Sequence, residues 1–141
     1  EYTDIEFVKE GVKIFVKRSK TDQSGEGMTK AIPYFDNINF CTVKALNEWV
    51  VEAELKEGKM FNISDKNVAL IIKKYANHAG LDAHRYAGHS LRSGFATSTA
   101  ESGAEERNIM AMTGHKSTEM VRRYIREANL FKNNALNKIK I

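Results

Sequence analysis

The sequence has few of the residues that build redox and metal sites. Cys41 is the single cysteine among 141 residues, so the chain by itself cannot form a disulfide bond, and a reducing compartment is favoured. We expect Cys41 to be a small buried hydrophobic residue and not a nucleophile. The four histidines show no zinc-ligand spacing, and no glycine motif of the P-loop type is present. We therefore expect neither a metal nor a cofactor.

Long apolar runs are also lacking. No stretch approaches the ~20 residues that a membrane helix needs, and no signal-peptide pattern opens the chain. Hydrophobic residues make up 42% and charged residues 28%, which is ordinary for a soluble globular protein. The length fits one domain. These features predict a soluble, cytoplasmic protein that does not act at a membrane.

Positive charge is unevenly spread along the chain. Residues 1–70 carry 10 Lys/Arg against 12 Asp/Glu, a balance of −2, whereas residues 71–141 carry 12 against 6, a balance of +6; together they give the net +4. A basic C-terminal half favours a polyanionic partner. Taken alone, so modest an excess more often means a solvated basic surface.

The hydrophobic pattern changes period near residue 41. Before it, Val12, Ile14 and Val16 alternate with Lys13, Phe15 and Lys17, and the segment as a whole predicts a three-stranded antiparallel meander over residues 4–34, with its last strand ending near Pro33. After it, helical spacing predicts helices over 42–55, 64–79, 90–102 and 105–112, and a fifth that opens at 117 or 118. We expect Thr42 to cap the first helix and Trp49 to be an ordinary core residue. The fold class is α+β: a small three-stranded antiparallel sheet followed by a mostly helical body.

Residues 88–126 hold the polar side chains with chemical potential. His89 and Arg92 are three positions apart, so on a helix they project from one face and can donate to one anion. His115 follows a glycine between two short helices, and Tyr124 lies in a stripe with Met120 and Val121. Singly, each has an ordinary explanation: a surface pair, a loop histidine and a core tyrosine.

The order His-x-x-Arg, Gly-His, Tyr resembles the tyrosine recombinase (phage integrase) family. Arg92 and His115 are 23 positions apart, and His115 and Tyr124 are 9 apart, as this family usually has them. The residues between them fit the family's style as well, namely Leu91, Gly94, Ala96, Thr97, Gly103, Met110 and Gly114. The resemblance extends more weakly to the loop RSKTDQSGEG, which looks like the family's lysine-bearing β-hairpin. It implies one partial catalytic domain over 1–141, with the meander and lysine hairpin in 1–36 and the helical part in 42–141.

The resemblance implies a site-specific recombinase or integrase that cleaves and rejoins double-stranded DNA. Tyr124 would be the nucleophile and would form a 3′-phosphotyrosine, while Arg92, His89 and His115 would stabilise the phosphate charge. Lys20 would protonate the leaving 5′-oxygen, with Lys17 as the second choice. Contacts to neighbouring phosphates would come from basic residues near the site: Lys17, Arg18, Lys116, Arg122, Arg123 and Arg126. For the group around Tyr124, the alternative is a solvated basic helix face.

The resemblance also implies a homo-oligomer on DNA, a synaptic tetramer in the family, and a bacterial, phage or mobile-element origin. Apolar residues of the tail would dock on a neighbouring protomer or pack on their own domain: Leu130, Phe131, Leu136 and Ile139.

One departure from the family concerns a second catalytic arginine, which the family carries on a helix before its first strand. No arginine precedes Arg18 in this sequence. We expect that arginine to lie outside this chain, so that the chain alone cleaves DNA poorly. Two alternatives stay open: a non-catalytic DNA-binding remnant of an integrase, and a type IB topoisomerase-like enzyme.

Overall fold

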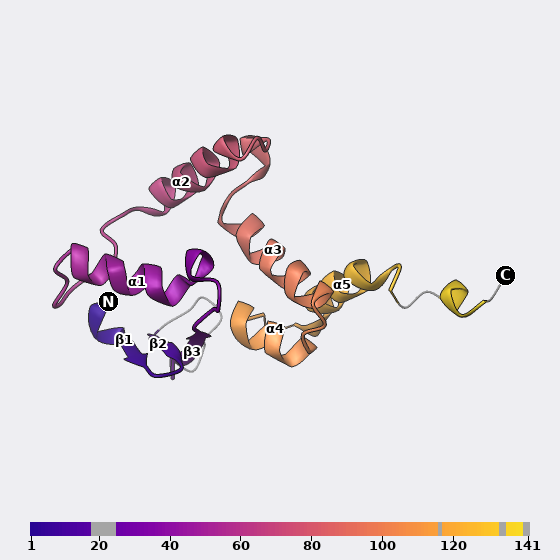
Figure 1. Ribbon diagram of the computed structural model, residues 1–141, viewed down its shortest axis with the longest axis horizontal. Coiled ribbons are helices and arrows are strands. Elements are labelled where there is room, and N and C mark those ends of the chain that lie inside the picture. The colour runs from indigo at the N-terminus through magenta and orange to yellow at the C-terminus, as the bar shows by residue number, and fades with distance from the viewer. Residues whose placement is uncertain (18–24, 116, 133–134, 140–141) are drawn as a thin grey trace. The chain divides into compact units, whose positions relative to one another are not determined.

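The computed structural model describes residues 1–17, 25–115, 117–132 and 135–139. The chain folds into two compact units, residues 1–62 and 63–141, each with its own elements (Figure 1). None of the helices in the described part of the chain is long and apolar enough to cross a bilayer.

The first unit is a small sheet with one helix. After the short 3-10 helix η1 (Tyr2–Asp4), the strands β1 (Ile5–Val8), β2 (Gly11–Val16) and β3 (Met28–Pro33) form an antiparallel sheet in the order β1-β2-β3. A second 3-10 turn, η2 (Ile38–Phe40), leads into the helix α1 (Thr42–Glu52). The predicted three-stranded meander, and the end of its last strand at Pro33, are confirmed.

One face of this sheet packs on α1. Val12 stands opposite Phe7 on β1 and Ile32 on β3, and all three contribute to a core that also holds Cys41 and Val43. Val12 and Val43 are fully buried, whereas Lys13 and Phe15, which alternate with the inward residues of β2, stay exposed. The alternation in the sequence therefore identified the buried face correctly.

The β1–β2 turn depends on a glycine. Gly11 has a φ of +155°, and a Cβ placed on it would lie 2.0 Å from the carbonyl oxygen of Ile32 on β3. A side chain at this position would collide with the backbone of the neighbouring strand, so only glycine fits there.

Two expectations for α1 are wrong. The N-cap is Cys41 and not Thr42, which is the first helical residue. Trp49 is not a core residue, since 44% of it is exposed; its ring stacks on Phe61 at 5.7 Å, and its Nε1–H donates to the Met60 carbonyl at 2.8 Å. The buried face of α1 is centred on Val43, and the indole instead holds the segment that follows the helix.

The second unit is helical. It contains α2 (Asp65–His78), the 3-10 helix η3 (Ala83–Arg85), α3 (Gly88–Glu101), α4 (Glu106–Thr113), α5 (Thr118–Asn129) and a short η4 (Ala135–Lys138). Ser64 caps α2 by accepting from the Asn67 N–H at 3.3 Å, and Ser117 caps α5 by accepting from the Glu119 N–H at 3.2 Å. All five predicted helices are present, together with α+β character for the chain as a whole.

The core of this unit lies where α3, α4 and α5 meet. Ala96 and Ala100 on α3, Ile109 on α4 and Val121 on α5 are buried, and Tyr124 packs against them. Small alanines let the helices approach closely, which explains why three short helices can share such a small core.

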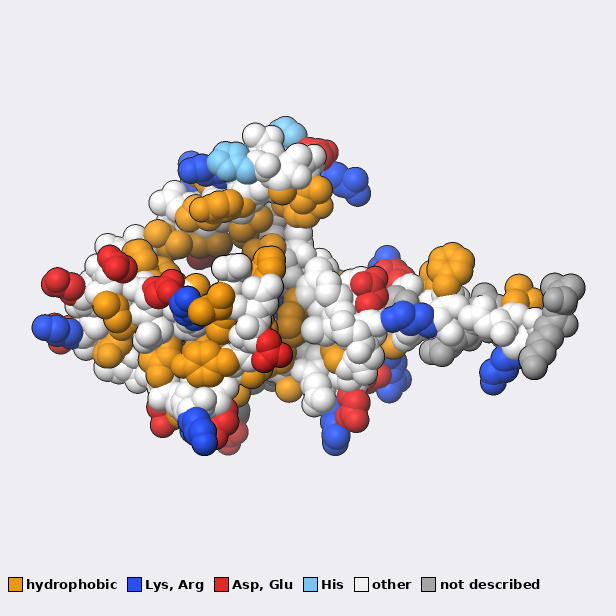
Figure 2. Space-filling view, viewed as in Figure 1, with side chains coloured by type: hydrophobic (Ala, Val, Ile, Leu, Met, Phe, Trp, Pro, Cys, Tyr) orange, Lys and Arg blue, Asp and Glu red, His pale blue; other side chains and the backbone are white. Residues whose placement is uncertain are grey.

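The apolar stripe of α2 is largely exposed. Val68, Ile71 and Tyr75 are exposed by 39%, 45% and 65%, while Ala76 is buried. The C-terminal tail forms the short η4, and Figure 2 shows hydrophobic side chains on its surface. The exposed large hydrophobic residues of the tail are Leu130, Phe131, Leu136 and Ile139.

Candidate functional site

The His-x-x-Arg pair lies on the first turns of α3, and both side chains are exposed. Ser90 fixes this helix start, because its hydroxyl accepts from the Ala87 N–H at 3.1 Å and donates to the Arg85 carbonyl at 3.1 Å. The first backbone N–H groups of a helix lack intrahelical partners and carry partial positive charge. His89 and Arg92 therefore add hydrogen-bond donors to the N-terminal end of α3, which already favours an anion.

His115 follows α4, which ends at Gly114 in the left-handed conformation with a φ of +69°. Its Nδ1 lies 2.7 Å from the Thr113 hydroxyl. Burial lowers the pKa of His115 below its ordinary value, and the positive charge of Arg92 lowers it further. Both causes favour the neutral form of the side chain. Since Arg92 acts on it electrostatically, the structure brings two of the predicted site residues, from α3 and from the α4–α5 connection, into one place.

Tyr124 comes to the same helical cluster from α5. The side chain is half-buried, and its ring packs on the core formed by Ala96, Ala100, Ile109 and Val121. The expected stripe on α5 is partly wrong, because Met120 is 44% exposed and Ile125 packs on the core in its place. A helix turns by about 100° per residue, so the stripe runs through Val121, Tyr124 and Ile125.

The predicted phosphate-contacting arginines lie on the surface of α5, and two of them are ion-paired. Arg122 Nε lies 2.9 Å from Glu106 on α4, and Arg123 Nε lies 3.0 Å from Glu127, an interaction that raises the pKa of Arg123. Arg126 is exposed. Exposed pairs of this kind contribute only about 0–1 kcal/mol, so a phosphate can compete for either guanidinium.

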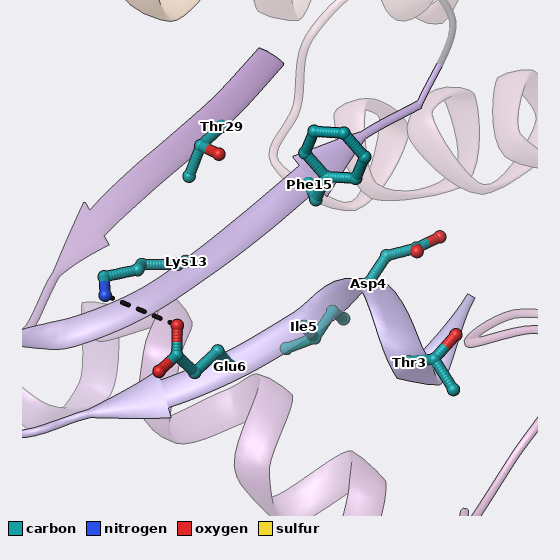
Figure 3. Close-up of a pocket in the computed structure, with 7 residues that line it drawn as sticks. All are labelled: Thr3, Asp4, Ile5, Glu6, Lys13, Phe15 and Thr29. Atoms are coloured by element: carbon teal, nitrogen blue, oxygen red, sulfur yellow. Dashed lines mark hydrogen bonds and ion pairs between the residues drawn. The ribbon is translucent and has the colours of Figure 1, made fainter. Parts of the chain in front are cut away.

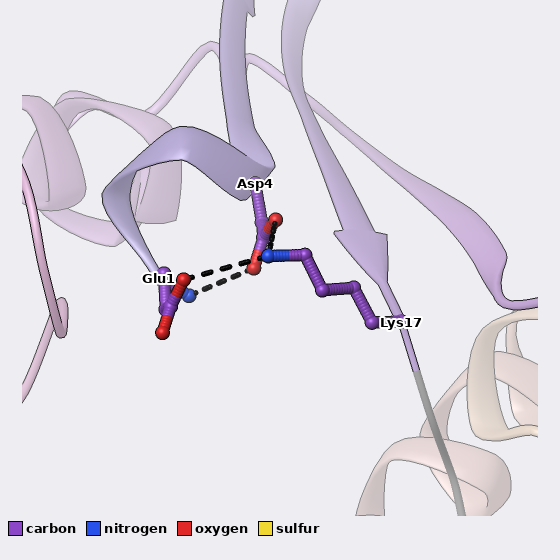
Figure 4. A network of polar contacts seen from close by, with 3 residues as sticks. All are labelled: Glu1, Asp4 and Lys17. Atoms are coloured by element: carbon purple, nitrogen blue, oxygen red, sulfur yellow. Dashed lines mark hydrogen bonds and ion pairs between the residues drawn. The ribbon is translucent and has the colours of Figure 1, made fainter.

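The ammonium of Lys17 forms ion pairs with two carboxylates at the beginning of the first unit. It lies 2.8 Å from Asp4 and 3.4 Å from Glu1, as Figure 4 shows. The hydrogen bond from Lys17 lowers the pKa of Asp4, and the same contact raises the pKa of Lys17. A lysine with a raised pKa gives up its proton less readily. The other predicted residues of this kind, Arg18, Lys20 and Lys116, lie outside the described residues.

Sequence reasoning missed the two carboxylates that hold Lys17. They reach it because β1 pairs with β2 in the register that places Ile5 opposite Ile14. No local pattern in the sequence signals this contact.

A pocket of ≈ 560 Å³ lies on the first unit (Figure 3). Lys13 and Glu6, which form an ion pair at 3.3 Å, line it together with other residues of η1 and the three strands: Thr3, Asp4, Ile5, Phe15 and Thr29. None of the predicted catalytic residues that the structure describes lines this pocket, and all four of these lie in the second unit. Within the described ranges, no group of three or more histidine, cysteine or acidic side chains is placed to hold a metal ion.

Comparison with known proteins bears directly on this arrangement. Residues 1–130 match the Phage integrase family. The chain belongs to this family. The match covers the sheet as well as the helices, so the resemblance predicted from residues 88–126 is confirmed and extends well beyond them.

Two relatives of this phage integrase family member bear recombinase names. The "Integrase/recombinase xerD homolog" of Selenomonas ruminantium is 46% identical over 151 residues, covering 99% of this chain and 44% of that protein. The "Tyrosine recombinase XerC" of Syntrophus aciditrophicus (strain SB) is 36% identical over 62 residues, covering 44% of this chain and 20% of that protein. The chain thus spans less than half the length of these curated relatives. No solved structure matches it.

Proposed function

We propose that this phage integrase family member acts in site-specific DNA recombination, cleaving and rejoining double-stranded DNA through a phosphotyrosine at Tyr124. The observation that carries the proposal is the convergence of Arg92, His115 and Tyr124 in one helical unit, where burial first and the charge of Arg92 second lower the pKa of His115. Both named relatives are recombinases by their descriptions.

The chemistry assigns a task to each side chain. The Tyr124 oxygen attacks the phosphorus and passes its proton to His89, a P–O(Tyr) bond forms, and the bond to the 5′-oxygen breaks. Negative charge grows on the non-bridging oxygens, where Arg92 and His89 donate hydrogen bonds, and His115 donates one when its Nε2 carries a proton. The guanidinium of Arg92 suits this role because its planar fork matches two phosphate oxygens.

The leaving 5′-oxygen needs a proton, which we assign to Lys20. Lys17 is the weaker candidate, because Asp4 and Glu1 occupy its ammonium and its pKa is raised. The phosphotyrosine conserves the energy of the broken bond, so a different 5′-hydroxyl can reverse the step. Strand exchange then requires neither ATP nor a metal, and it requires several protomers on DNA, for which a synaptic tetramer is the family's arrangement.

Covalent trapping tests the proposal. The protein is mixed with a nicked duplex that carries its genomic attachment sequence, so that the 5′-hydroxyl fragment diffuses away and the reverse step is blocked. We expect a denaturant-stable protein–DNA adduct, and none with Tyr124→Phe, which keeps the ring that packs on Val121 and loses the nucleophile. An adduct of equal yield in both proteins would exclude Tyr124 as the nucleophile.

A second candidate function is DNA binding without cleavage. The observation that favours it is the group of arginines on the surface of α5, Arg122, Arg123 and Arg126, which can contact phosphates without any cleavage. Intact DNA binding without an adduct would establish this second function.

A further inference from the structure

Thr113 makes two short contacts that fix where its hydroxyl proton lies. It is the last residue of α4 and is half-buried. Its Oγ1 lies 2.7 Å from the Ile109 carbonyl and 2.7 Å from Nδ1 of His115. A hydroxyl has one proton, and a carbonyl oxygen can only accept. The Thr113 proton therefore goes to Ile109.

The second contact then determines the tautomer of His115. With its only proton donated to Ile109, the Thr113 oxygen can serve His115 only as an acceptor. Nδ1 must carry the hydrogen that fills this contact. A neutral imidazole has one N–H, so Nε2 is left without a proton.

We propose that Thr113 is a positioning residue that holds neutral His115 as the Nδ1–H tautomer, with Nε2 free to accept. The inference about the ring stands on the two contacts alone, whereas its catalytic meaning rests on the proposed function. In this tautomer, Nε2 accepts a proton or a hydrogen bond from a partner at the site. It donates to a phosphate oxygen only after it has itself been protonated.

The sequence contains a faint signal for this role. A threonine two residues before the histidine, ahead of the helix-ending Gly114, places a hydroxyl beside the ring. Nothing in the residue order distinguishes it from the many threonines that bond back to the preceding turn, as Thr113 also does with Ile109.

Nitrogen-15 NMR of the imidazoles reads the tautomer directly in the DNA-free protein, at a pH at which the rings are neutral. His115→Gln identifies the His115 signals among those of the four histidines. We expect the Nδ1–H form in the wild type and in Thr113→Ser, which keeps the hydroxyl. In Thr113→Val, which keeps the shape and loses the hydroxyl, we expect a shift of the population toward Nε2–H. A wild-type ring already protonated at Nε2, or a valine variant with an unchanged tautomer, would overturn the proposal.

Trapping rates with the suicide duplex separate this inference from the proposed function. We expect Thr113→Val to form adduct about 10- to 100-fold more slowly, the usual cost of losing a partner that orients a functional histidine, with rescue by Thr113→Ser. If the tautomer shifts as expected but the wild type forms no adduct, the function fails while the role of Thr113 stands. If the valine variant changes tautomer and cleaves at the wild-type rate, the tautomer has no catalytic role.

Discussion

His115 is a residue whose charge state depends on its neighbours. Its pKa is lowered by burial first and by the Arg92 charge second. Neither cause is visible from a Gly-His dipeptide, because both arise from groups that packing brings close. The lowered pKa leads to one prediction about Arg92 and one about the dependence of stability on pH.

Replacing Arg92 by glutamine should raise the pKa of His115, since the nearby positive charge that disfavours the imidazolium is removed. An NMR titration of the His115 ring measures the shift. Arg85→Gln, which removes an exposed arginine from η3, is the matched control and should leave that pKa in place. An unchanged pKa in Arg92→Gln would show that burial alone lowers it.

The same lowered pKa makes stability depend on pH. The folded-state pKa of His115 lies below the ordinary value of 6.5, so the unfolded chain binds the proton more tightly. This contribution to stability is complete above pH 6.5 and is lost as the pH falls from there through the folded-state pKa. Urea unfolding at a series of pH values should therefore show a loss between these limits that is smaller in His115→Gln. A glutamine variant with the full wild-type loss would assign the effect to another group.

At the scale of the elements, backbone geometry distinguishes two glycines that look alike in the sequence. Gly11 has a positive φ and no room for a side chain beside Ile32, whereas Gly94 lies within α3 and a Cβ there would meet open space.

We expect Gly11→Ala to destabilise the protein by about 2–4 kcal/mol through strain and collision with β3. Gly94→Ala should stabilise it by about 0.5–1 kcal/mol, because alanine favours a helix interior. Urea unfolding followed by circular dichroism compares both variants with the wild type. Equal stability of Gly11→Ala and the wild type would mean that the β1–β2 turn can rearrange.

The ion pair between α4 and α5 offers a test of the basic surface. Glu106→Gln releases Arg122, so we expect DNA affinity to rise about two- to fivefold at low salt, since exposed pairs contribute about 0.2–1 kcal/mol. The gain should shrink as salt screens the phosphates. Fluorescence anisotropy with a labelled duplex measures both effects.

Glu105→Gln is the matched control for this experiment. Glu105 is the N-cap of α4 and pairs with Arg107 on that helix. The Glu105→Gln variant therefore changes the net charge by the same amount as Glu106→Gln and leaves Arg122 paired with Glu106. Equal gains in both variants would mean that net charge alone, and not Arg122, governs binding.

At the scale of the whole molecule, the chain spans 44% of its relative from Selenomonas ruminantium. Four of the five predicted catalytic residues lie in the second compact unit, residues 63–141. We expect Arg92→Gln to trap an adduct about 100-fold more slowly than the wild type, the scale of losing one preorganised charge donor. Equal rates would show that cleavage does not require Arg92.

The sequence by itself determined the family, the α+β class and the order of the elements. Periods of two and of 3.6 residues are local properties, and the β1–β3 meander and the five helices follow from them. The order and spacing of His89, Arg92, His115 and Tyr124 made them candidates through their resemblance to the family. The helix ends at Ser64 and Gly114 were also readable, because caps act within one turn.

Only the tertiary structure decided the state of these groups. The carboxylates around Lys17 depend on strand register, and the lowered pKa of His115 depends on burial and on Arg92, 23 positions earlier. The exposure of Trp49 and of the α2 stripe likewise depended on which surfaces found partners. Burial, ion pairing and tautomer are properties of neighbours in space, and residues far apart in the sequence become neighbours only when the chain folds.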